Sequence, residues 1–302
     1  MKVHGLLLLD KPVGLSSNTA LQKVRRLLSA DKAGHGGTLD PMASGVLPLM
    51  FGEGCKLAGA SLTHDKAYEA EVRFGIRTTT DDVEGEVLSR SDQRPGEADL
   101  KAALKSFVGL IMQAPPVYSA LKVGGKAMYR HAREGAPIEA PPRQVRVDSI
   151  ELLSFDGERV RLQIVCGKGT YIRSIARDLG EMLGCGAHLS ALRRTRVGDF
   201  DVRDAVPLQQ LVDGGPAVAA AYLQGLLNLV DGWPTVTLGD AAAARFAQGQ
   251  GVPADRFEAA EGFGPAATQL AVLHDGRLLG LARYGTLPDG LAAALPVRVI
   301  VD

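Results

Sequence analysis

The chain has 302 residues, of which 46% are hydrophobic and 23% charged, as in a globular protein with one large core or two domains. Its 34 Lys and Arg residues balance 34 Asp and Glu residues, which at first argues against a nucleic-acid partner. The apolar run Leu6–Leu9 is too short for a membrane span or signal peptide, and the three cysteines lack the CxxC spacing of zinc sites. We therefore expect a cytoplasmic protein with free thiols, no metal site and no membrane partner.

The charges are distributed unevenly along the chain. Residues 1–200 carry 28 Lys and Arg against 23 Asp and Glu, whereas residues 201–302 carry 6 against 11. Between Val117 and Val147, six basic residues accompany two acidic ones. This segment suits a surface that follows a phosphate backbone, and a solvated charged face gives the same count.

The first elements are a predicted strand, a tight turn and a helix. Leu6–Leu9 favours the strand, and the segment D-K-P-V-G-L-S-S contains the turn. A capped helix is predicted from Ser17 or Asn18 to about Leu28. Lys11 lies in this turn, where a structural role and an RNA contact are equally compatible with the sequence.

A glycine-rich loop follows at residues 34–45, with the sequence G-H-G-G-T-L-D-P-M-A-S-G. Its four glycines and Pro41 forbid a regular helix or a central strand, and they permit close approach of another molecule. The loop holds one carboxylate, Asp40, before an apolar run at residues 46–51 that predicts a buried strand or short helix. It lacks the spacing of a phosphate loop or a dinucleotide fingerprint. A catalytic acid on a rigid loop and an Asp that caps the next element are the two interpretations.

Residues 65–85 predict a half-buried strand and a polar turn that closes its hairpin. Tyr68, Ala70, Val72 and Phe74 alternate with charged residues, so one face of the strand is expected to pack. Tyr68 begins that face. The turn contains an acidic pair, Asp81-Asp82.

A basic insertion at about residues 113–145 follows an amphipathic helix predicted at 99–108. It interleaves tyrosines with the basic residues Lys122, Lys126 and Arg130, and includes a short helix at about 127–134. That combination is typical of an arm that closes on RNA and becomes ordered on binding. It is equally typical of a solvated connector.

Two strands are predicted at 145–155 and 159–166, before a helix that starts at residue 171 or 172. Arg173 lies in the first turn of that helix, where backbone N–H groups favour an anion. A basic strand follows, in which Leu192 suits a core position. Its arginines, among them Arg193, are interpreted either as phosphate contacts or as edge-strand charges.

The C-terminal part is predicted to form a separate small unit. Residues 201–231 favour helix and loop with a break at 214–216, and a new unit starts at Trp233. It contains a helix at 241–247 and strands near 270–273, 278–284 and 297–301. The expected division is therefore 1–231 and 232–302.

Five separate motifs resemble those of the bacterial TruB family of pseudouridine synthases, which act on the uridine at position 55 of the tRNA T-arm loop. They are the D-K-P opening, the H-x-G-x-L-D-P-x-A-x-G loop, D-K-x-Y, P-P-x-Y-S-A-x-K and K-G-T-Y-I-R-S. The resemblance implies that Asp40 is the nucleophile or base, Arg173 its counter-ion, and Tyr68 and Leu192 the walls of the uracil pocket. It also makes His35 the residue that displaces the target base.

The same resemblance assigns Asp82 to an acidic position of the family's T-x-T-x-D-x-x-G turn and the insertion to its thumb loop. It implies an α+β fold with a mixed, largely antiparallel central sheet, followed by a small β-rich, PUA-like pseudo-barrel that touches RNA. Isomerisation needs no redox group, so no cofactor is implied; the partner is the tRNA T-arm stem-loop, and a monomer is expected without a protein partner. The competing functions are a non-catalytic tRNA-folding factor and a nuclease or phosphotransferase that uses Asp81-Asp82 to hold metal.

Overall fold

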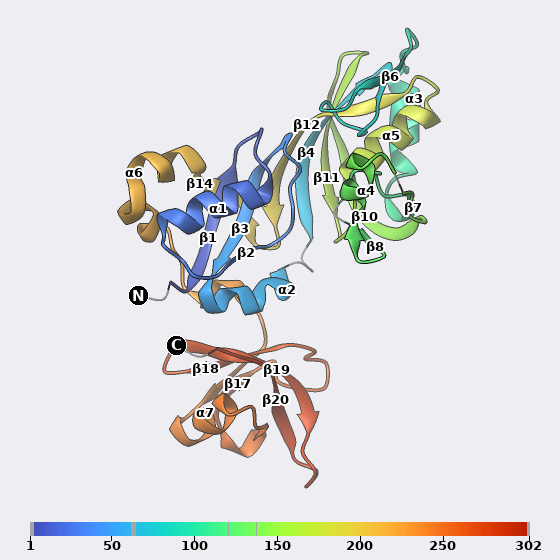
Figure 1. Cartoon of the computed structure of the whole chain (residues 1–302). Helices are drawn as coiled ribbons and strands as arrows, with labels where there is room; N and C mark the ends of the chain where they lie inside the picture. The colour runs from blue at the N-terminus through green and yellow to red at the C-terminus, as the bar shows by residue number, and fades with distance from the viewer. Residues whose placement is uncertain (1–2, 62–64, 120, 137, 301–302) are drawn as a thin grey trace.

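A computed structural model of the chain describes residues 3–61, 65–119, 121–136 and 138–300 (Figure 1). Two sheets dominate it, one built from residues 5–207 and the other from residues 235–299. No helix in these ranges has the length and apolar character that a membrane span requires. Cys166 and Cys185 are buried and Cys55 is half-buried, all three as free thiols.

The large sheet has ten strands, in the order β14-β1-β3-β12-β4-β11-β10-β7, with β2 paired to β3 and β13 to β12. The β1–β14 and β3–β12 pairs are parallel and the other pairs are antiparallel, which confirms the predicted mixed, largely antiparallel sheet. The strands are β1 (Gly5–Lys11), β2 (Ala33–His35), β3 (Ala43–Phe51), β4 (Lys66–Phe74), β7 (Gly109–Gln113), β10 (Arg143–Phe155), β11 (Arg159–Cys166), β12 (Ala187–Val197), β13 (Phe200–Asp201) and β14 (Val206–Pro207).

Helices cover the two ends of this sheet. In Figure 1, α1 and α6 lie at the β1 end, and α3 and α5 lie at the β7–β10 end. The α-helices are α1 (Ser17–Leu27), α2 (Ala58–Ser61), α3 (Glu97–Lys105), α4 (Met128–Arg133), α5 (Ile172–Met182), α6 (Leu208–Ala221) and α7 (Asp240–Ala247). Short 3-10 helices occupy Gly52–Leu57, Val202–Asp204, Leu226–Leu229 and Ala254–Arg256.

Local sequence signals account for several helix boundaries. The Ser16 hydroxyl caps α1 by accepting a hydrogen bond from the Thr19 N–H group. The predicted break at residues 214–216 is a kink inside α6, where Gly215 has φ 69° and Pro216 follows. Helix α3 ends at Lys105, three residues before the predicted end.

The C-terminal sheet has the order β16-β20-β19-β18-β15-β17 and is covered by α7. Its strands are β15 (Thr235–Leu238), β16 (Val252–Pro253), β17 (Phe257–Glu261), β18 (Leu270–His274), β19 (Arg277–Thr286) and β20 (Ala292–Val299). The strand predicted at 297–301 therefore begins earlier and ends at Val299, and residues 301–302 lie outside the described part. The sheet forms the expected β-rich half-barrel.

Strand β1 joins the two cores because it is apolar on both faces. Leu7 and Leu9 pack in the core of the large sheet. Leu6 and Leu8 point the other way and pack with Leu281 and neighbouring residues of the C-terminal sheet. A strand buried on both faces needs a continuous apolar run, which explains the Leu6–Leu9 sequence.

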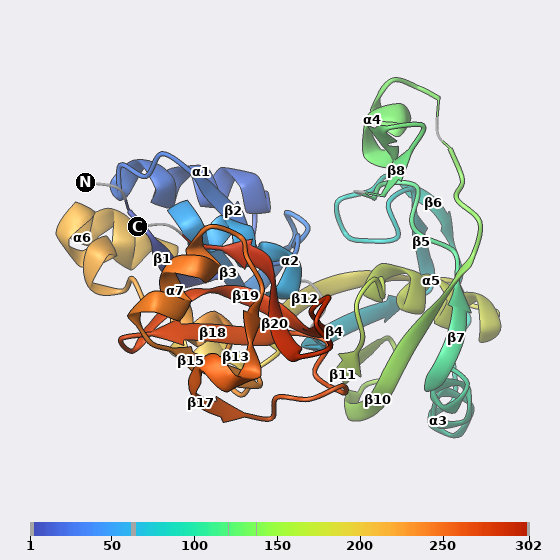
Figure 2. The ribbon, with the colours of Figure 1, turned by 90° about the horizontal axis from the view of Figure 1, so that it is seen from below.

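Two small hairpins project from the large sheet. β5 (Ile76–Thr78) pairs with β6 (Val87–Arg90), and β8 (Lys122–Val123) pairs with β9 (Lys126–Ala127). The prediction that residues 75–85 close a hairpin of the Tyr68 strand is wrong, because β4 pairs with β11 and β12 and the turn belongs to β5–β6. The basic insertion lies between the end of β7 and the start of β10, and Figure 2 shows α4 and β8 set apart from the C-terminal unit.

Candidate active site

The Asp40 loop between β2 and β3 is held on both sides of Asp40, by the first residue of α1 and by the turn that precedes this helix. The Ser17 hydroxyl accepts a hydrogen bond from the Leu39 N–H (2.7 Å) and donates one to the Leu39 carbonyl (2.9 Å). The Gly14 N–H donates to the Pro41 carbonyl at 2.8 Å. Both neighbours of Asp40 are thereby fixed, so the carboxylate is presented on a rigid backbone.

Lys11 belongs to the same support. Its side chain is buried, and its ammonium group donates hydrogen bonds to the carbonyls of Pro12 (2.9 Å) and Leu15 (2.6 Å). Burial lowers the pKa of Lys11 to about 8, and the Asp40 carboxylate opposes that shift. These contacts favour the structural interpretation of Lys11 over a contact with RNA.

The glycine that ends the loop motif, Gly45, is required by the neighbouring strand. It pairs with Arg194 of β12 and has φ 109°. A Cβ at this position would lie 2.1 Å from the Arg194 carbonyl oxygen. Any larger residue would therefore push β3 away from β12 and displace the loop.

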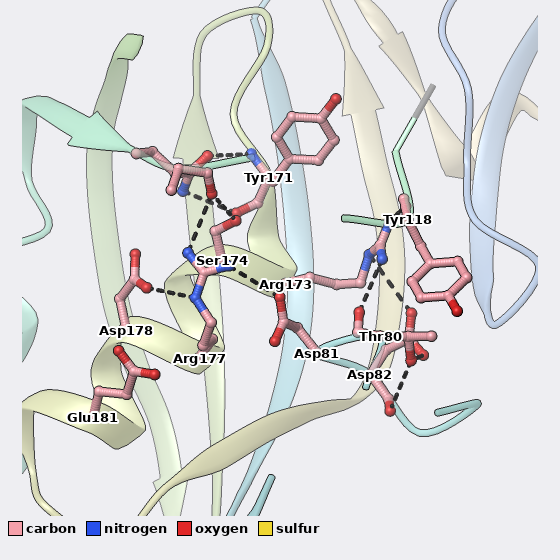
Figure 3. Close-up of polar contacts among 12 residues, drawn as sticks. Thr80, Asp81, Asp82, Tyr118, Tyr171, Arg173, Ser174, Arg177, Asp178 and Glu181 are labelled. Carbon is pink, nitrogen blue, oxygen red and sulfur yellow. Dashed lines mark hydrogen bonds and ion pairs between the residues drawn. The ribbon is translucent and has the colours of Figure 1, made fainter. Parts of the chain in front are cut away.

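Arg173 of α5 pairs with Asp40, which comes from a distant part of the chain. Figure 3 shows Arg173 beside Thr80, Asp82 and Tyr118. Its buried Nε lies 2.9 Å from Asp40 Oδ2 and 3.6 Å from Asp82 Oδ2, as an ion pair without hydrogen-bond geometry. Its terminal nitrogens donate instead to the carbonyls of Thr80 (2.9 Å) and Tyr118 (2.8 Å). Arg173 and Asp40, which the family resemblance pairs, therefore lie together, and the contact is made through Nε.

The adjacent acidic residues Asp81 and Asp82 serve different partners. Asp82 is buried and accepts hydrogen bonds from the Thr80 hydroxyl (2.5 Å) and the Glu84 N–H (3.0 Å). Asp81 Oδ2 lies 3.0 Å from Arg177 Nη1. Because each carboxylate faces a different arginine, the pair does not form the two-ligand metal site that a nuclease would need.

Asp40 borders a cavity of about 260 Å³, close to the lower end of the roughly 300–1,000 Å³ range of small-molecule sites. Tyr68 of β4 and Leu192 of β12, the two walls that the family resemblance implies, line it together with Arg173. The inward face predicted for β4 is confirmed, since Tyr68, Ala70, Val72 and Phe74 are all buried. Burial raises the pKa of the Tyr68 hydroxyl to about 12, so it is neutral at pH 7.

A second cavity of about 590 Å³ shares Asp40 and Arg173 with the first. His35, Glu84 and the insertion residues Tyr118 and Tyr129 line it. Among the described residues, the buried Nδ1 atom of His35 has no hydrogen-bond partner. Burial, reinforced by the charge of Arg194, lowers the pKa of His35, so the imidazole is neutral at pH 7.

The predicted basic residues of the insertion lie outside the linings of both cavities. Lys126 forms an ion pair with Glu134, and Arg130 Nε lies 3.4 Å from the Tyr129 hydroxyl. Lys122 is exposed on β8. The insertion is nevertheless tied to the site, because the Tyr118 carbonyl accepts from Arg173.

Arg193 lies beside the Asp40 loop rather than at a sheet edge. Its Nη2 atom is 2.7 Å from Asp10 Oδ2, and β12 lies between β3 and β4 in the middle of the large sheet. The edge-strand interpretation is therefore wrong. Its neighbour Arg194 is 1% exposed, so the phosphate interpretation of that arginine does not fit either.

Lys66 and Arg194 line the first cavity, although the sequence did not predict either of them there. The alternation of side chains along a strand could have predicted both positions. Lys66 stands two residues before Tyr68, and Arg194 two residues after Leu192, so each shares a strand face with a predicted wall residue.

Among the described residues, one cluster outside the site has atoms close enough to share a cation. Asp240, His274 and Asp275 each offer an atom within 4.8 Å of the others. Both aspartates are exposed, a situation common without an ion, and we assign none.

Comparisons with known proteins agree with this geometry. The chain matches the family model of the TruB family pseudouridylate synthase N-terminal domain over residues 25–172 and the tRNA pseudouridylate synthase B C-terminal domain over residues 173–230. It is 49% identical to tRNA pseudouridine synthase B of Burkholderia lata, over 99% of this chain and 91% of that protein. It is 45% identical to tRNA pseudouridine synthase B of Ectopseudomonas mendocina, over 99% of this chain and 96% of that protein.

Two solved structures are similar over nearly the whole chain. One is a Cbf5-Nop10-Gar1 complex, with a TM-score of 0.74 and 28% identity over 98% of this chain and 84% of that chain. The other is an H/ACA RNP bound to a substrate RNA that contains 2'-deoxyuridine, with a TM-score of 0.75 and 26% identity over 99% and 85%. Together with the sequence relatives and the Asp40–Arg173 pair at a tyrosine-lined cavity, they show that this chain belongs to the TruB family of pseudouridylate synthases.

Proposed function

We propose that this protein converts the T-loop uridine at position 55 of tRNA to pseudouridine, acting as a monomer in the cytoplasm. The observation that carries the proposal is the Asp40 carboxylate, 2.9 Å from the buried Arg173 Nε at the edge of a cavity lined by Tyr68 and Leu192. A carboxylate oriented by a neighbouring guanidinium can attack the nucleoside or act on its sugar. The names of the sequence relatives support tRNA as the substrate.

In this mechanism the target uridine leaves the stacked T loop and enters the first cavity. Tyr68 offers a flat aromatic face and Leu192 an apolar one, which offset the stacking lost in the RNA. His35, neutral and beside the second cavity, occupies the space that the base has left. Asp82 holds Arg173 in place and thereby orients Asp40.

The RNA-binding surface in this proposal combines the insertion with the cations around the first cavity. Lys122, Lys126 and Arg130 contact the T-arm backbone from the insertion, and Arg193 lies beside the loop. The unit from residue 232 to 302 adds shape recognition as a PUA-like domain, since it carries a net negative charge.

The test uses an unmodified tRNA transcript incubated with the full chain, without added metal or cofactor, followed by mapping of every uridine. We expect one pseudouridine, at position 55. Asp40→Asn should abolish it and keep tRNA binding largely unchanged, because the amide preserves the shape and removes the nucleophilic charge.

A non-catalytic tRNA-folding factor would bind the transcript and leave every uridine unchanged. Pseudouridine at another site in the tRNA would support the isomerase assignment and refute position 55 as the target. An Asp40→Asn variant as active as the wild type would refute the role of the carboxylate.

A further inference from the structure

Arg194 is a buried guanidinium whose contacts are all with neutral oxygens. It is 1% exposed, and its Nε donates to the Val46 carbonyl (2.9 Å) while Nη2 donates to the Gly37 carbonyl (3.2 Å). Its side chain also hydrogen-bonds the hydroxyl of Tyr68, which pairs with it across β4 and β12. Arg194 thus links the Asp40 loop, β3 and the tyrosine wall of the cavity.

Arg194 lacks the counter-ion that Arg173 has. Arg173 lies between two carboxylates, whereas Arg194 forms no ion pair within the described ranges 3–61, 65–119, 121–136 and 138–300. An arginine remains protonated in proteins, so this is a full positive charge removed from water. Burying such a charge without a partner costs several kcal/mol, which three neutral acceptors offset only in part.

The cavity that Arg194 lines is strongly cationic. Lys66, Arg143, Lys168, Arg173 and Arg194 line it, and Asp40 is the one carboxylate among the described residues of the lining. Arg143 and Lys168 are partly or fully exposed and suit phosphate groups of the substrate. Arg194 is different, because it is buried beside Tyr68 and two residues from Leu192, at the walls assigned to the base.

We propose that Arg194 supplies the positive charge that stabilises the detached uracil ring as an anion. The inference rests on the proposed function. When the N1–C1′ bond breaks, its electron pair stays on N1 and spreads over the ring, and Asp40 meets the electron-deficient sugar. C5 then bonds to C1′, the C5 proton passes to water, and N1 takes up a proton, so the product has the atoms of the substrate. A fixed charge beside the ring stabilises this intermediate because the protein does not have to rearrange as the anion forms.

The test measures single-turnover rates and tRNA affinity for Arg194→Gln, which keeps a donor for a carbonyl and removes the charge. We expect a rate about 100-fold lower, the size seen when an electrostatic donor is lost, with tRNA affinity within about threefold of wild type. A tRNA carrying 5-fluorouridine at the target position gives the second readout. Fluorine itself stabilises the ring anion, so the charge of Arg194 matters less on this substrate. Cleavage of the N1–C1′ bond should therefore slow only about 10-fold in Arg194→Gln.

Arg73→Met is the matched control, since Arg73 is on the same strand as Tyr68 and pairs with Glu158 outside both cavities. It should leave the rate unchanged both on the uridine tRNA and on the 5-fluorouridine tRNA. A purely structural role for Arg194 predicts equal rate losses on both substrates and overturns the proposal. A loss of affinity with an unchanged rate also overturns it, because Arg194 would then be a phosphate contact.

Arg194→Lys keeps the inference testable if Arg194→Gln does not fold. It retains the charge and gives up the planar fork, so we expect a rate within about 10-fold of wild type and an unchanged fluorine effect. A folded Lys variant that binds tRNA and is about 100-fold slower would overturn the proposal. A wild-type protein that modifies no uridine refutes the proposed function instead, which separates the two failures.

Discussion

The two cavities that meet at Asp40 have opposite charge. The first is lined by five cationic side chains and one carboxylate. The second has the carboxylates of Asp40, Asp82 and Glu84, with Arg173 as its one Arg or Lys lining residue. Asp40 therefore lies where the local charge changes sign, and an anion formed beside it is favoured on the Tyr68 side.

The two cavities also differ in how they are built. The first cavity takes four of its lining residues from β4 and β12, adjacent strands in the middle of the large sheet. The second depends on the Asp82 turn and on the insertion that carries Tyr118 and Tyr129. Chemistry that needs fixed geometry belongs on the strands, whereas loops and insertions can adjust to RNA.

The largest effect is expected from removing Arg173, which separates the two cavities. Arg173→Met leaves the buried Asp82 carboxylate without its cation and releases the carbonyls of Thr80 and Tyr118. We expect a loss of about 3–5 kcal/mol in unfolding free energy, measured with denaturant, together with loss of isomerisation.

Asp82→Asn in the Arg173→Met background should restore part of that stability, because it removes the unpaired charge. It should not restore activity, since Asp40 still lacks its counter-ion. A stability loss below about 1 kcal/mol for Arg173→Met would contradict the burial argument.

A smaller effect is expected from Ser17→Ala, which loosens the loop and removes one hydroxyl from the lining of the second cavity. The variant removes both hydrogen bonds that fix Leu39, and we expect about 1–3 kcal/mol of destabilisation with a lower turnover rate. Ser190→Ala is the control, because the Ser190 hydroxyl also makes two hydrogen bonds, to Glu71, outside the cavities. Equal turnover in the two variants would show that the Ser17 clamp does not position Asp40.

The smallest effect is a pH dependence of stability. Burial lowers the pKa values of His35 and His188, so the unfolded chain takes up protons first as the pH falls below about 6.5. The contribution of these histidines to the unfolding free energy should therefore be constant above that pH and decrease toward pH 5.5. His35→Gln should flatten the slope, and a stability that rises on acidification would contradict the assignment.

Patterns of neighbouring residues were sufficient to predict much of the fold. The α1 boundaries, the inward face of β4 and the break at Gly215 all depend on contacts within a few residues. Motif resemblance supplied the Asp40–Arg173 pair, which joins residues far apart in the sequence. Local patterns do not predict the order of the strands in the sheet. The strand that carries Arg193 could therefore be interpreted as an edge strand, although it lies in the middle of the sheet.

The geometry of Arg173 also lay beyond the sequence. Its terminal nitrogens are taken up by backbone carbonyls of Thr80 and Tyr118, and no side-chain pattern reports such acceptors. The burial of Arg194 depends on Gly45 and Tyr68 meeting it from two neighbouring strands. Such positions follow from register, which long-range packing decides.

The most direct test of the account asks which cavity receives the target base. A T-arm stem-loop with 4-thiouridine at the target position would be bound to Asp40→Asn, irradiated, and the crosslinked peptide identified by mass spectrometry. We expect the crosslink at Tyr68 or Leu192, in the cationic cavity. A crosslink confined to Tyr118 or Tyr129, in the acidic cavity, would contradict the account.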